Sequence, residues 1–253
     1  MCWGNAPYAC RCIASEDHVS SHLWIVMPVY NEQESVGGVF AEWLPALRQL
    51  GISFTLLALN DGSIDDTLAI LQRVARANSE VEVVDKPNSG HGPTCIVGYR
   101  HALAAGAEWV LQIDSDGQCD PRYLAEFWCA SADAVVVFGL RVTRDDGWMR
   151  WWISRVVSLV CLITRGTWIP DANVPYRLMR RDVLLRALEW IPNDFYLANI
   201  LLAIELRCLA RFKWVRIHFR GRFGGTSSIR FRRLSRYGWQ LFRQLSLPRR
   251  REQ

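Results

Sequence analysis

The chain has 253 residues, half of them hydrophobic and 22% charged, which suits one sizeable α/β domain better than two independent domains. Its formal net charge is +5, and nearly all of the basic residues are Arg, concentrated in the last third of the chain. A basic end suits nucleic acid, anionic lipid or a phosphate-bearing substrate, but no helix-turn-helix, zinc knuckle or RNA-binding signature supports nucleic acid.

The cysteines and the apolar runs indicate the cellular compartment in which we expect the protein. Eight cysteines are dispersed without the spacing of a disulfide scaffold or a paired zinc site, and the Cys10 and Cys12 pair is too weak a signal to carry a metal. Residues 1–20 lack the apolar core of a secretory signal, and the longest apolar run, residues 156–164, falls far short of the ~20 residues that span a bilayer. We expect a reduced, cytoplasmic protein, with peripheral contact to the cytoplasmic face of a membrane left open.

In the first half of the chain, strand-like and helix-like patterns alternate. Short apolar runs predict strands at residues 23–29, 54–59, 81–84 and 109–113. Helical spacing of apolar residues predicts helices at residues 31–50, 67–77 and 93–105. This alternation indicates an α/β fold, Rossmann-like and doubly wound, with a mostly parallel sheet and helices on both faces.

Polar loops follow the first, second and fourth of these strands. They begin at Tyr30, Asn60 and Asp114. Because doubly wound sheets bind their ligands at the carboxyl ends of the strands, we expect these loops to form the site.

The second half of the chain is less regular. It predicts strands at residues 134–138, 176–179 and 214–219, the last at a sheet edge, and helices at residues 148–163, 181–189, 196–208 and 229–247, the last basic and amphipathic. We divide the chain into a disordered tail at residues 1–21, a globular domain at residues 22–228 and a basic C-terminal segment at residues 229–253.

Asp114 and Asp116 are the leading candidates for chemistry. Two carboxylates one residue apart at the end of a buried strand can both face a cation, and Gln118 can supply a further oxygen. Mg²⁺ and Mn²⁺ prefer oxygen ligands and take one or two protein carboxylates together with substrate phosphates. A metal so placed neutralises a pyrophosphate and helps it leave. The alternative is a solvated loop with turn-forming acids, which the position after an apolar strand disfavours.

The other two strand ends carry candidates for nucleotide binding. Tyr30 can stack on a nucleobase that Glu32 contacts, although Asn31 and Glu32 also suit the first turn of a helix. Asp61 can accept a hydrogen bond from a base or a ribose, although Asp followed by Gly also favours a plain turn. Each motif alone leaves both interpretations open.

The order of these motifs resembles that of the family 2 glycosyltransferases. Val26-Met27-Pro28-Val29-Tyr30-Asn31-Glu32 comes first, then Asn60-Asp61-Gly62-Ser63, then Asp114-Ser115-Asp116-Gly117-Gln118. The pattern is most similar to the group of dolichol-phosphate mannosyltransferases and polyprenyl-phosphate glycosyltransferases, over about residues 23–229. The resemblance implies a GT-A fold, a nucleoside-diphosphate sugar donor, and Mg²⁺ or Mn²⁺ as the cofactor.

The resemblance also implies roles for single residues. The nucleotide base and ribose would be lined by Pro28, Tyr30, Glu32, Leu59 and Asp61. The diphosphate and the metal would be met by Asp114, Ser115 and Asp116, with Gln118 as a further metal ligand. Arg141 and Arg222 match family arginines near the donor and its diphosphate, and a guanidinium fork suits phosphate.

Three departures from the family pattern affect this assignment. The usual Asp-Asp-Gly-Ser motif begins here with Asn60, which removes a charge but keeps Asp61. A family lysine is replaced by Ser228, so Arg222 or Arg230 must compensate the phosphate charge. The two transmembrane helices common in the bacterial polyprenyl-phosphate enzymes are missing, which leaves a lipid-phosphate or a glycan acceptor open.

The implied reaction is attack on the anomeric carbon of the sugar with inversion, and the nucleoside diphosphate leaves. A lipid phosphate is already largely ionised near pH 7, because the second phosphate pKa is about 6, so it needs positioning more than a base. A sugar hydroxyl would need a carboxylate base. Asp171 resembles the acceptor-side Asp of the family and is the first candidate; Asp194 is the second, although it also suits a helix N-cap.

Three functions are therefore compared: a polyprenyl-phosphate glycosyltransferase on a membrane surface, a soluble family 2 transferase acting on a hydroxyl, and a nucleotide-binding module without catalysis. Trp148, Trp151 and Trp152 with their neighbouring arginines favour a membrane interface, although a core-facing stripe would also explain them. A dehydrogenase is disfavoured, because no G-x-G-x-x-G follows the first strand. The loop at Gly90-His91-Gly92 lies near the donor in the family and receives no role.

Overall fold

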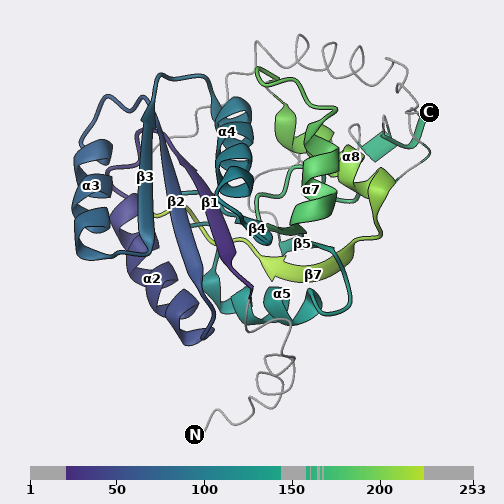
Figure 1. Cartoon of the computed structure of the whole chain (residues 1–253), viewed down its shortest axis with the longest axis horizontal. Helices are drawn as coiled ribbons and strands as arrows, with labels where there is room; N and C mark the ends of the chain where they lie inside the picture. Colours follow the sequence, from purple (N-terminus) through teal and green to yellow (C-terminus); the bar gives the residue numbers. More distant parts are fainter. Residues whose placement is uncertain are drawn as a thin grey trace, which may run out of the picture.

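The computed structural model (Figure 1) describes residues 21–143, 158–159, 161–163, 166, 168–195 and 197–224. Nearly all of the predicted tail, most of the predicted helix at residues 148–163 with its tryptophans, and the basic segment at residues 229–253 lie outside the described residues. Within the described part of the chain, no helix is long and apolar enough to cross a bilayer.

One sheet organises the described residues. Its strand order is β3-β2-β1-β4-β6-β5-β7. The strands are β1 (Leu23–Val29), β2 (Phe54–Asp61), β3 (Val81–Lys86), β4 (Trp109–Gln112), β5 (Val136–Thr143), β6 (Arg177–Arg180) and β7 (Lys213–His218). All neighbouring strands of this sheet pair in parallel, except that β6 runs antiparallel to both β4 and β5. The predicted mostly parallel sheet, with its last strand at an edge, is confirmed.

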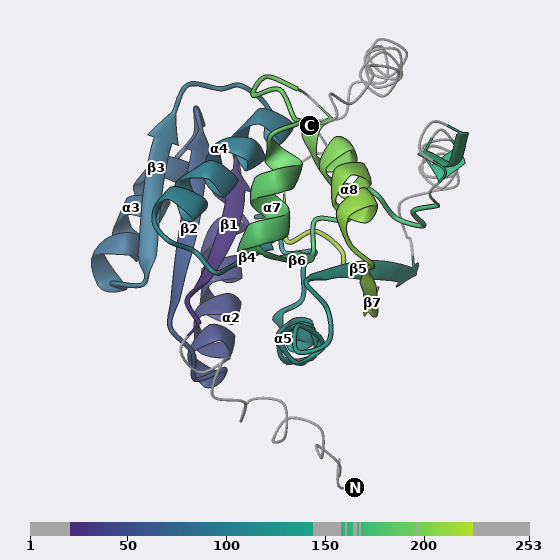
Figure 2. The ribbon, with the colours of Figure 1, turned by 45° about the vertical axis from the view of Figure 1, so that its right-hand side comes forward.

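Helices cover both faces of the sheet. They are α2 (Val36–Gln49), α3 (Thr67–Ala77), α4 (His91–Ala104), α5 (Leu124–Ala130), α7 (Arg181–Leu188) and α8 (Ala198–Leu209), with a 3-10 turn η1 (Pro121–Tyr123) before α5. The chain moves outward from β1 to β3 and then returns to β4, so right-handed crossovers place α2 and α3 on one face and α4 on the other. Figure 2 shows α4, α7 and α8 gathered on one side of the sheet.

The core explains why the first strands are so apolar. All seven residues of β1 are buried, because β1 lies in the middle of the sheet with helices above and below. The helix α4 approaches β1 and β2 closely at Gly98, where an added Cβ would lie 2.5 Å from Val26 Cγ1 and 2.8 Å from Leu59 Cδ1. A glycine at this position thus lets a helix rest directly on the two strands that carry the motif loops.

Two parts of the sequence-based prediction are wrong. The first helix begins at Val36 rather than near residue 31, because Asn31 adopts a φ of +52° and the chain then turns before entering α2. The backbone N–H of Asn31 bonds Ser63 Oγ at 3.0 Å, and its side-chain oxygen accepts the N–H of Ile64 at 2.9 Å. The short elements η1 and α5 were not predicted, since seven residues show little periodicity.

Candidate active site

The predicted site residues gather at one edge of the sheet. The strand order reverses between β1 and β4, and a doubly wound sheet binds its ligand at the carboxyl ends of such strands. Tyr30 and Asp114 follow these two strands, and Asp61 ends β2. Because β6 is antiparallel, the turn that contains Asp171 precedes it at this same edge, where β5 also ends beyond Arg141.

The loop after β4 is fixed by hydrogen bonds. Ser115 is buried and donates from Oγ to the carbonyl of Pro28 at 3.0 Å, while Ser35 Oγ lies 3.2 Å from the Ser115 carbonyl oxygen. The backbone N–H of Gln118 donates to Asp116 Oδ1 at 3.0 Å. Proline suits position 28, because its pairing with β4 has already ended there and a ladder N–H is not needed.

The pKa values of the two aspartates in this loop are shifted in opposite directions. Burial and the negative charge of Asp114 raise the pKa of Asp116 to about 6. Burial also acts to raise the pKa of Asp114, but the charge and hydrogen bond of His91, together with the charges of Arg177 and Arg141, outweigh this and the net shift is downward. The negative charge of Asp114 makes ionisation of Asp116 less favourable. A cation bound between the two carboxylates would stabilise their ionised forms.

The donor set fits a hard cation. Among the described residues, no three His, Cys, Asp or Glu side chains are grouped so as to hold a metal by themselves. Mg²⁺ and Mn²⁺ do not need such a group, because they bind one or two carboxylates and take further oxygens from phosphates and water. The Gln118 amide donates to the Arg220 carbonyl at 3.1 Å, which leaves its oxygen for another partner. Its role as a metal ligand stays a prediction.

The predicted nucleotide end is partly open. The Tyr30 side chain is 42% exposed beside the end of β1. Glu32 is held from three directions: its N–H bonds Thr67 Oγ1 at 2.9 Å, and its carboxylate accepts from Ser35 Oγ at 2.6 Å and from Arg222 Nη2 at 2.9 Å. Glu32 is thus a fixed acceptor next to an exposed ring.

Asp61 serves as an anchor for the loop that leads into α4. Its Oδ1 accepts from Lys86 Nζ and, at 2.9 Å, from the N–H of Ser89, and its Oδ2 accepts from the N–H of Gly90 at 2.9 Å. Burial acts to raise the pKa of Asp61, but the bonds from Lys86 and Ser89 outweigh it, so the pKa lies below its ordinary value. Asp61 therefore shapes this loop whether or not it also contacts a nucleotide.

Residues 219–224, here called the crossing segment, pass over the loop after β4. The N–H of Phe223 donates to the Asp116 carbonyl at 3.1 Å, and the N–H of Arg220 to the Gln118 carbonyl at 3.4 Å. The side chain of Arg222 lies between two carboxylates, with Nη2 2.9 Å from Glu32 Oε1 and Nε 3.4 Å from Asp116 Oδ2. Arg222 thus sits where a diphosphate bridging these motifs would need a cation.

Arg141 and Asp171 form a pair. Arg141 Nε and Nη2 donate to the two carboxylate oxygens of Asp171, both at 2.7 Å, and the Asp171 side chain is fully buried. This two-bond geometry is the strongest form of ion pair. The rival candidate Asp194 is exposed and lies three residues before the N-cap of α8, Leu197, so the N-cap interpretation of Asp194 is wrong.

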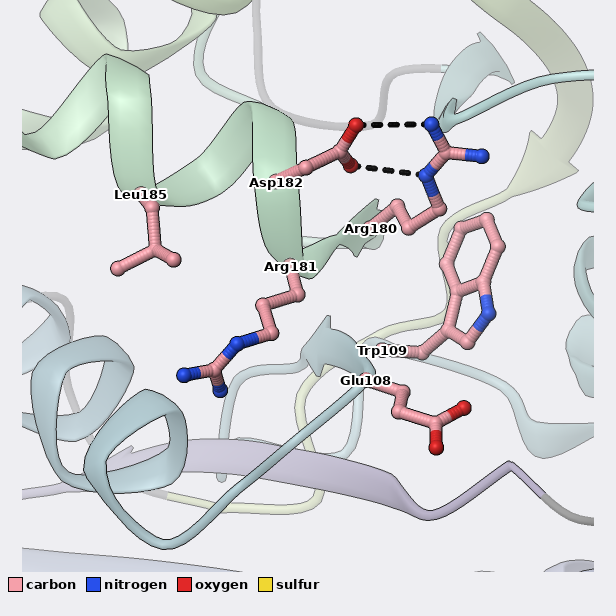
Figure 3. A pocket seen from close by; sticks show the side chains of 6 residues that line it. All are labelled: Glu108, Trp109, Arg180, Arg181, Asp182 and Leu185. Carbon is pink, nitrogen blue, oxygen red and sulfur yellow. Dashed lines mark hydrogen bonds and ion pairs between the residues drawn. The ribbon is translucent and has the colours of Figure 1, made fainter.

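Another hollow lies at the opposite edge of the sheet, where β4 begins and β6 ends (Figure 3). Three of its four charged side chains, Arg180, Arg181 and Asp182, are bonded within the chain. Arg180 and Asp182 make two bonds of 2.8 Å, and Arg181 donates to the carbonyls of Leu103 and Ala107 at 2.7 and 3.1 Å. We therefore place the site at the motif loops and not in this hollow.

Comparison with known proteins identifies the family. The model of the family described as glycosyl transferase family 2 matches residues 24–187. The chain belongs to glycosyl transferase family 2. The matched region includes every motif loop and the Arg141–Asp171 pair, but it ends before the crossing segment, so the role of Arg222 depends on its contacts alone.

A curated relative and two solved structures refine the comparison. The undecaprenyl-phosphate 4-deoxy-4-formamido-L-arabinose transferase of Sodalis glossinidius (strain morsitans) is 31% identical over 163 residues, which are 63% of this chain and 49% of the relative. The chain thus spans about half the length of that relative. Glucosyl-3-phosphoglycerate synthase from Mycobacterium tuberculosis, solved with Mn²⁺, uridine diphosphate and phosphoglyceric acid, superposes with a TM-score of 0.69 at 19% identity, covering 97% of this chain and 86% of that one.

TarS 1–349 of S. aureus, solved with UDP, superposes with a TM-score of 0.52 at 18% identity, covering 77% of this chain and 57% of that one. At such identities the likeness shows the fold, and the fold is the GT-A fold that the motif order implied.

One residue that contacts the candidate site, His91, lies outside the family motifs. His91, the first residue of α4, places its Nε2 3.0 Å from Asp114 Oδ1. In the sequence His91 stands 23 positions before Asp114, in a glycine-bearing loop with no catalytic signature. Only the return of the chain from β3 to β4 brings the two side chains together.

Proposed function

We propose that this chain is an inverting glycosyltransferase that moves a sugar from a nucleoside-diphosphate sugar to a polyprenyl-phosphate-type acceptor, with Mg²⁺ or Mn²⁺ bound. The observation that carries the proposal is the convergence of three family 2 motif loops at the switch point of the sheet, with Asp114 and Asp116 at its centre. In support, the curated relative is named as an undecaprenyl-phosphate transferase.

The donor nucleotide would lie over the ends of β1 and β2. Tyr30 offers an exposed ring for stacking and Glu32 offers a fixed acceptor. Pro28 and Leu59, which are paired in β1 and β2, would line the floor together with Asp61 at the end of β2. Aromatic stacking together with a fixed acceptor orients a base without moving the protein.

The diphosphate would lie over the loop after β4. Asp114 and Asp116, with Gln118, would hold Mg²⁺ or Mn²⁺, which when bound neutralises the charge of the departing diphosphate. Ser115 keeps this loop on β1 through its bond to Pro28. Arg222 would exchange its contacts with Glu32 and Asp116 for the diphosphate oxygens, which its guanidinium group can bind with two parallel bonds.

The acceptor side favours a phosphate over a hydroxyl. The carboxylate of Asp171 is already paired on both oxygens with Arg141, so it is not poised as a base for a hydroxyl. A phosphate monoester is largely ionised near pH 7 and needs no base. In this arrangement Asp171 would position the guanidinium group of Arg141 near the end of β5 to bind phosphate oxygens.

A transfer assay tests this function. The chain is incubated with Mn²⁺, undecaprenyl phosphate in detergent micelles, and one radiolabelled donor at a time from a panel of uridine- and guanosine-diphosphate hexoses. We expect label from one donor to pass into the organic phase, with loss of that product in Asp116→Ala but not in the distant control Asp182→Ala. Label that passes instead to a water-soluble sugar acceptor, or a product unaffected by Asp116→Ala, would contradict the proposal.

A further inference from the structure

His91 contacts the site but belongs to none of the motifs. It opens α4, and its side chain is about half exposed, with Nε2 3.0 Å from Asp114 Oδ1. The same carboxylate oxygen is approached at 3.5 Å by the amide nitrogen of Gln112, the last residue of β4. Two side chains from different elements therefore converge on one oxygen of a predicted metal ligand.

The two ring nitrogens of His91 have different neighbours. Nδ1 faces the amide nitrogen of Asn199 at 3.5 Å and the thiol of Cys95 at 3.8 Å. Nε2 faces Asp114 Oδ1, and because an ionised carboxylate oxygen only accepts, this contact requires a hydrogen on Nε2.

The hydrogen bonds around Asp114 and His91 continue into the buried core. Tyr99 donates to the Gln112 oxygen at 2.6 Å, which turns the Gln112 amide nitrogen toward Asp114. The buried side chain of Arg177 donates to the Asn199 carbonyl at 3.0 Å and so holds the start of α8 beside His91. Asp114 Oδ1 is thus bound to a connected set of side chains from α4, β4, β6 and α8.

We infer that His91 is a positioning residue for the metal site, which holds Asp114 by Oδ1 and would leave Oδ2 for the cation. The inference rests on the proposed function, because it assigns a role within the same donor site. Residues that hydrogen-bond a metal ligand set its orientation, and their loss typically weakens metal binding about 10- to 100-fold. We expect a loss of this order in the Mn²⁺ affinity of the nucleotide complex.

Substitutions at position 91 test this role through binding. Mn²⁺ titration followed by electron paramagnetic resonance, in the presence of uridine or guanosine diphosphate, measures metal affinity without turnover. His91→Ala should weaken binding, and His91→Gln, whose amide can still donate to Asp114, should recover most of the loss. His101→Ala is the matched control, since His101 lies on the same helix and pairs with Glu82 at 2.7 Å away from the site.

The outcomes separate the two proposals. If the wild type binds no metal with either nucleotide, the proposed function fails and this inference fails with it. If the wild type binds and His91→Ala binds equally well, only the role of His91 is overturned. A loss that His91→Gln fails to recover would contradict hydrogen bonding as its cause.

The position of the ring hydrogen gives a readout that needs no metal. Long-range ¹H–¹⁵N correlation spectra of the histidine rings show which ring nitrogens carry hydrogen. We expect His91 to carry a hydrogen on Nε2. A His91 ring that carries hydrogen only on Nδ1 could not donate to Asp114 and would overturn the inference.

Discussion

At the scale of single residues, several charged groups of the proposed site also hold neighbouring segments of the fold. Asp61 anchors the loop before α4 through Lys86 and two backbone N–H groups, although the motif order predicts it as a nucleotide contact. Glu32 and Asp116 share Arg222 in the same way. Their substitution will therefore change stability as well as binding, and each effect needs its own measurement.

Asp61→Asn tests the anchoring role. Its pKa is below the ordinary value of 3.8, so the stabilisation is complete above about pH 4 and is lost as the pH falls through the folded-state pKa. We expect the substitution to lower the free energy of unfolding by about 3 kcal/mol at pH 7, since it leaves Lys86 without its charge partner. Urea denaturation at pH 7 and at decreasing pH should show that the difference in free energy of unfolding between the wild type and Asp61→Asn becomes smaller below pH 4.

Asp182→Asn is the matched control for this experiment. Asp182 also pairs with a basic side chain, but both partners are about half exposed, so the expected cost is below about 1 kcal/mol. The anchoring role would be contradicted if Asp61→Asn lowered the free energy of unfolding as little as the control does. It would also be contradicted if the difference from the wild type increased in acid.

At the scale of elements, the crossing segment determines how the site is covered. Its Phe223 ring lies against Gly117, which has a φ of +80°. A Cβ added at Gly117 would lie 2.5 Å from two ring carbons of Phe223. Gly117 is therefore required by the contact as well as by its backbone conformation.

A pair of glycine substitutions separates these two requirements. Gly106 has a φ of +91° with nothing within 4 Å of an added Cβ, so Gly106→Ala should cost only the backbone strain of about 1–2 kcal/mol. Gly117→Ala should cost more, and the excess should vanish in the Phe223→Ala background. Equal costs of the two alanines in urea denaturation would show that the crossing segment does not lie on Gly117.

The elements also show what the sequence can predict. Buried apolar runs predicted the strands, since burial on both faces leaves little choice of residue, and helical spacing predicted α3 to within its observed bounds, Thr67–Ala77. The start of α2, the short α5 and the crossing segment were not predicted, because they depend on contacts between distant residues. Asn31 with Ser63, and Phe223 with Gly117, are such contacts.

In the candidate site, too, some features were predicted from the sequence and others were not. The motif order predicted which edge carries Asp61, Asp114 and Asp116, because strand ends are readable from the sequence. It did not predict that Asp171 is paired with Arg141 or that His91 contacts Asp114, since both contacts depend on how β4, β5 and β6 are ordered in the sheet.

At the scale of the whole molecule, the chain carries a formal net charge of +5, with its arginines concentrated toward the C-terminal end. If the acceptor is a lipid phosphate, the chain must meet a membrane surface. We expect it to sediment with vesicles that contain anionic lipid, and to be released at about 0.5 M salt, where surface charges are screened within a few ångströms. Sedimentation with neutral vesicles only, or none with either, would count against a membrane acceptor.

Asp114 and Asp116 should form a metal-dependent nucleotide site. Isothermal titration with uridine and guanosine diphosphate, each with and without Mn²⁺, tests it most directly, on the wild type, Asp116→Ala and the distant control Asp182→Ala. We expect that one nucleotide binds only with metal, that Asp116→Ala abolishes this binding, and that Asp182→Ala retains it. If neither nucleotide binds, with or without metal, Asp114 and Asp116 do not form such a site.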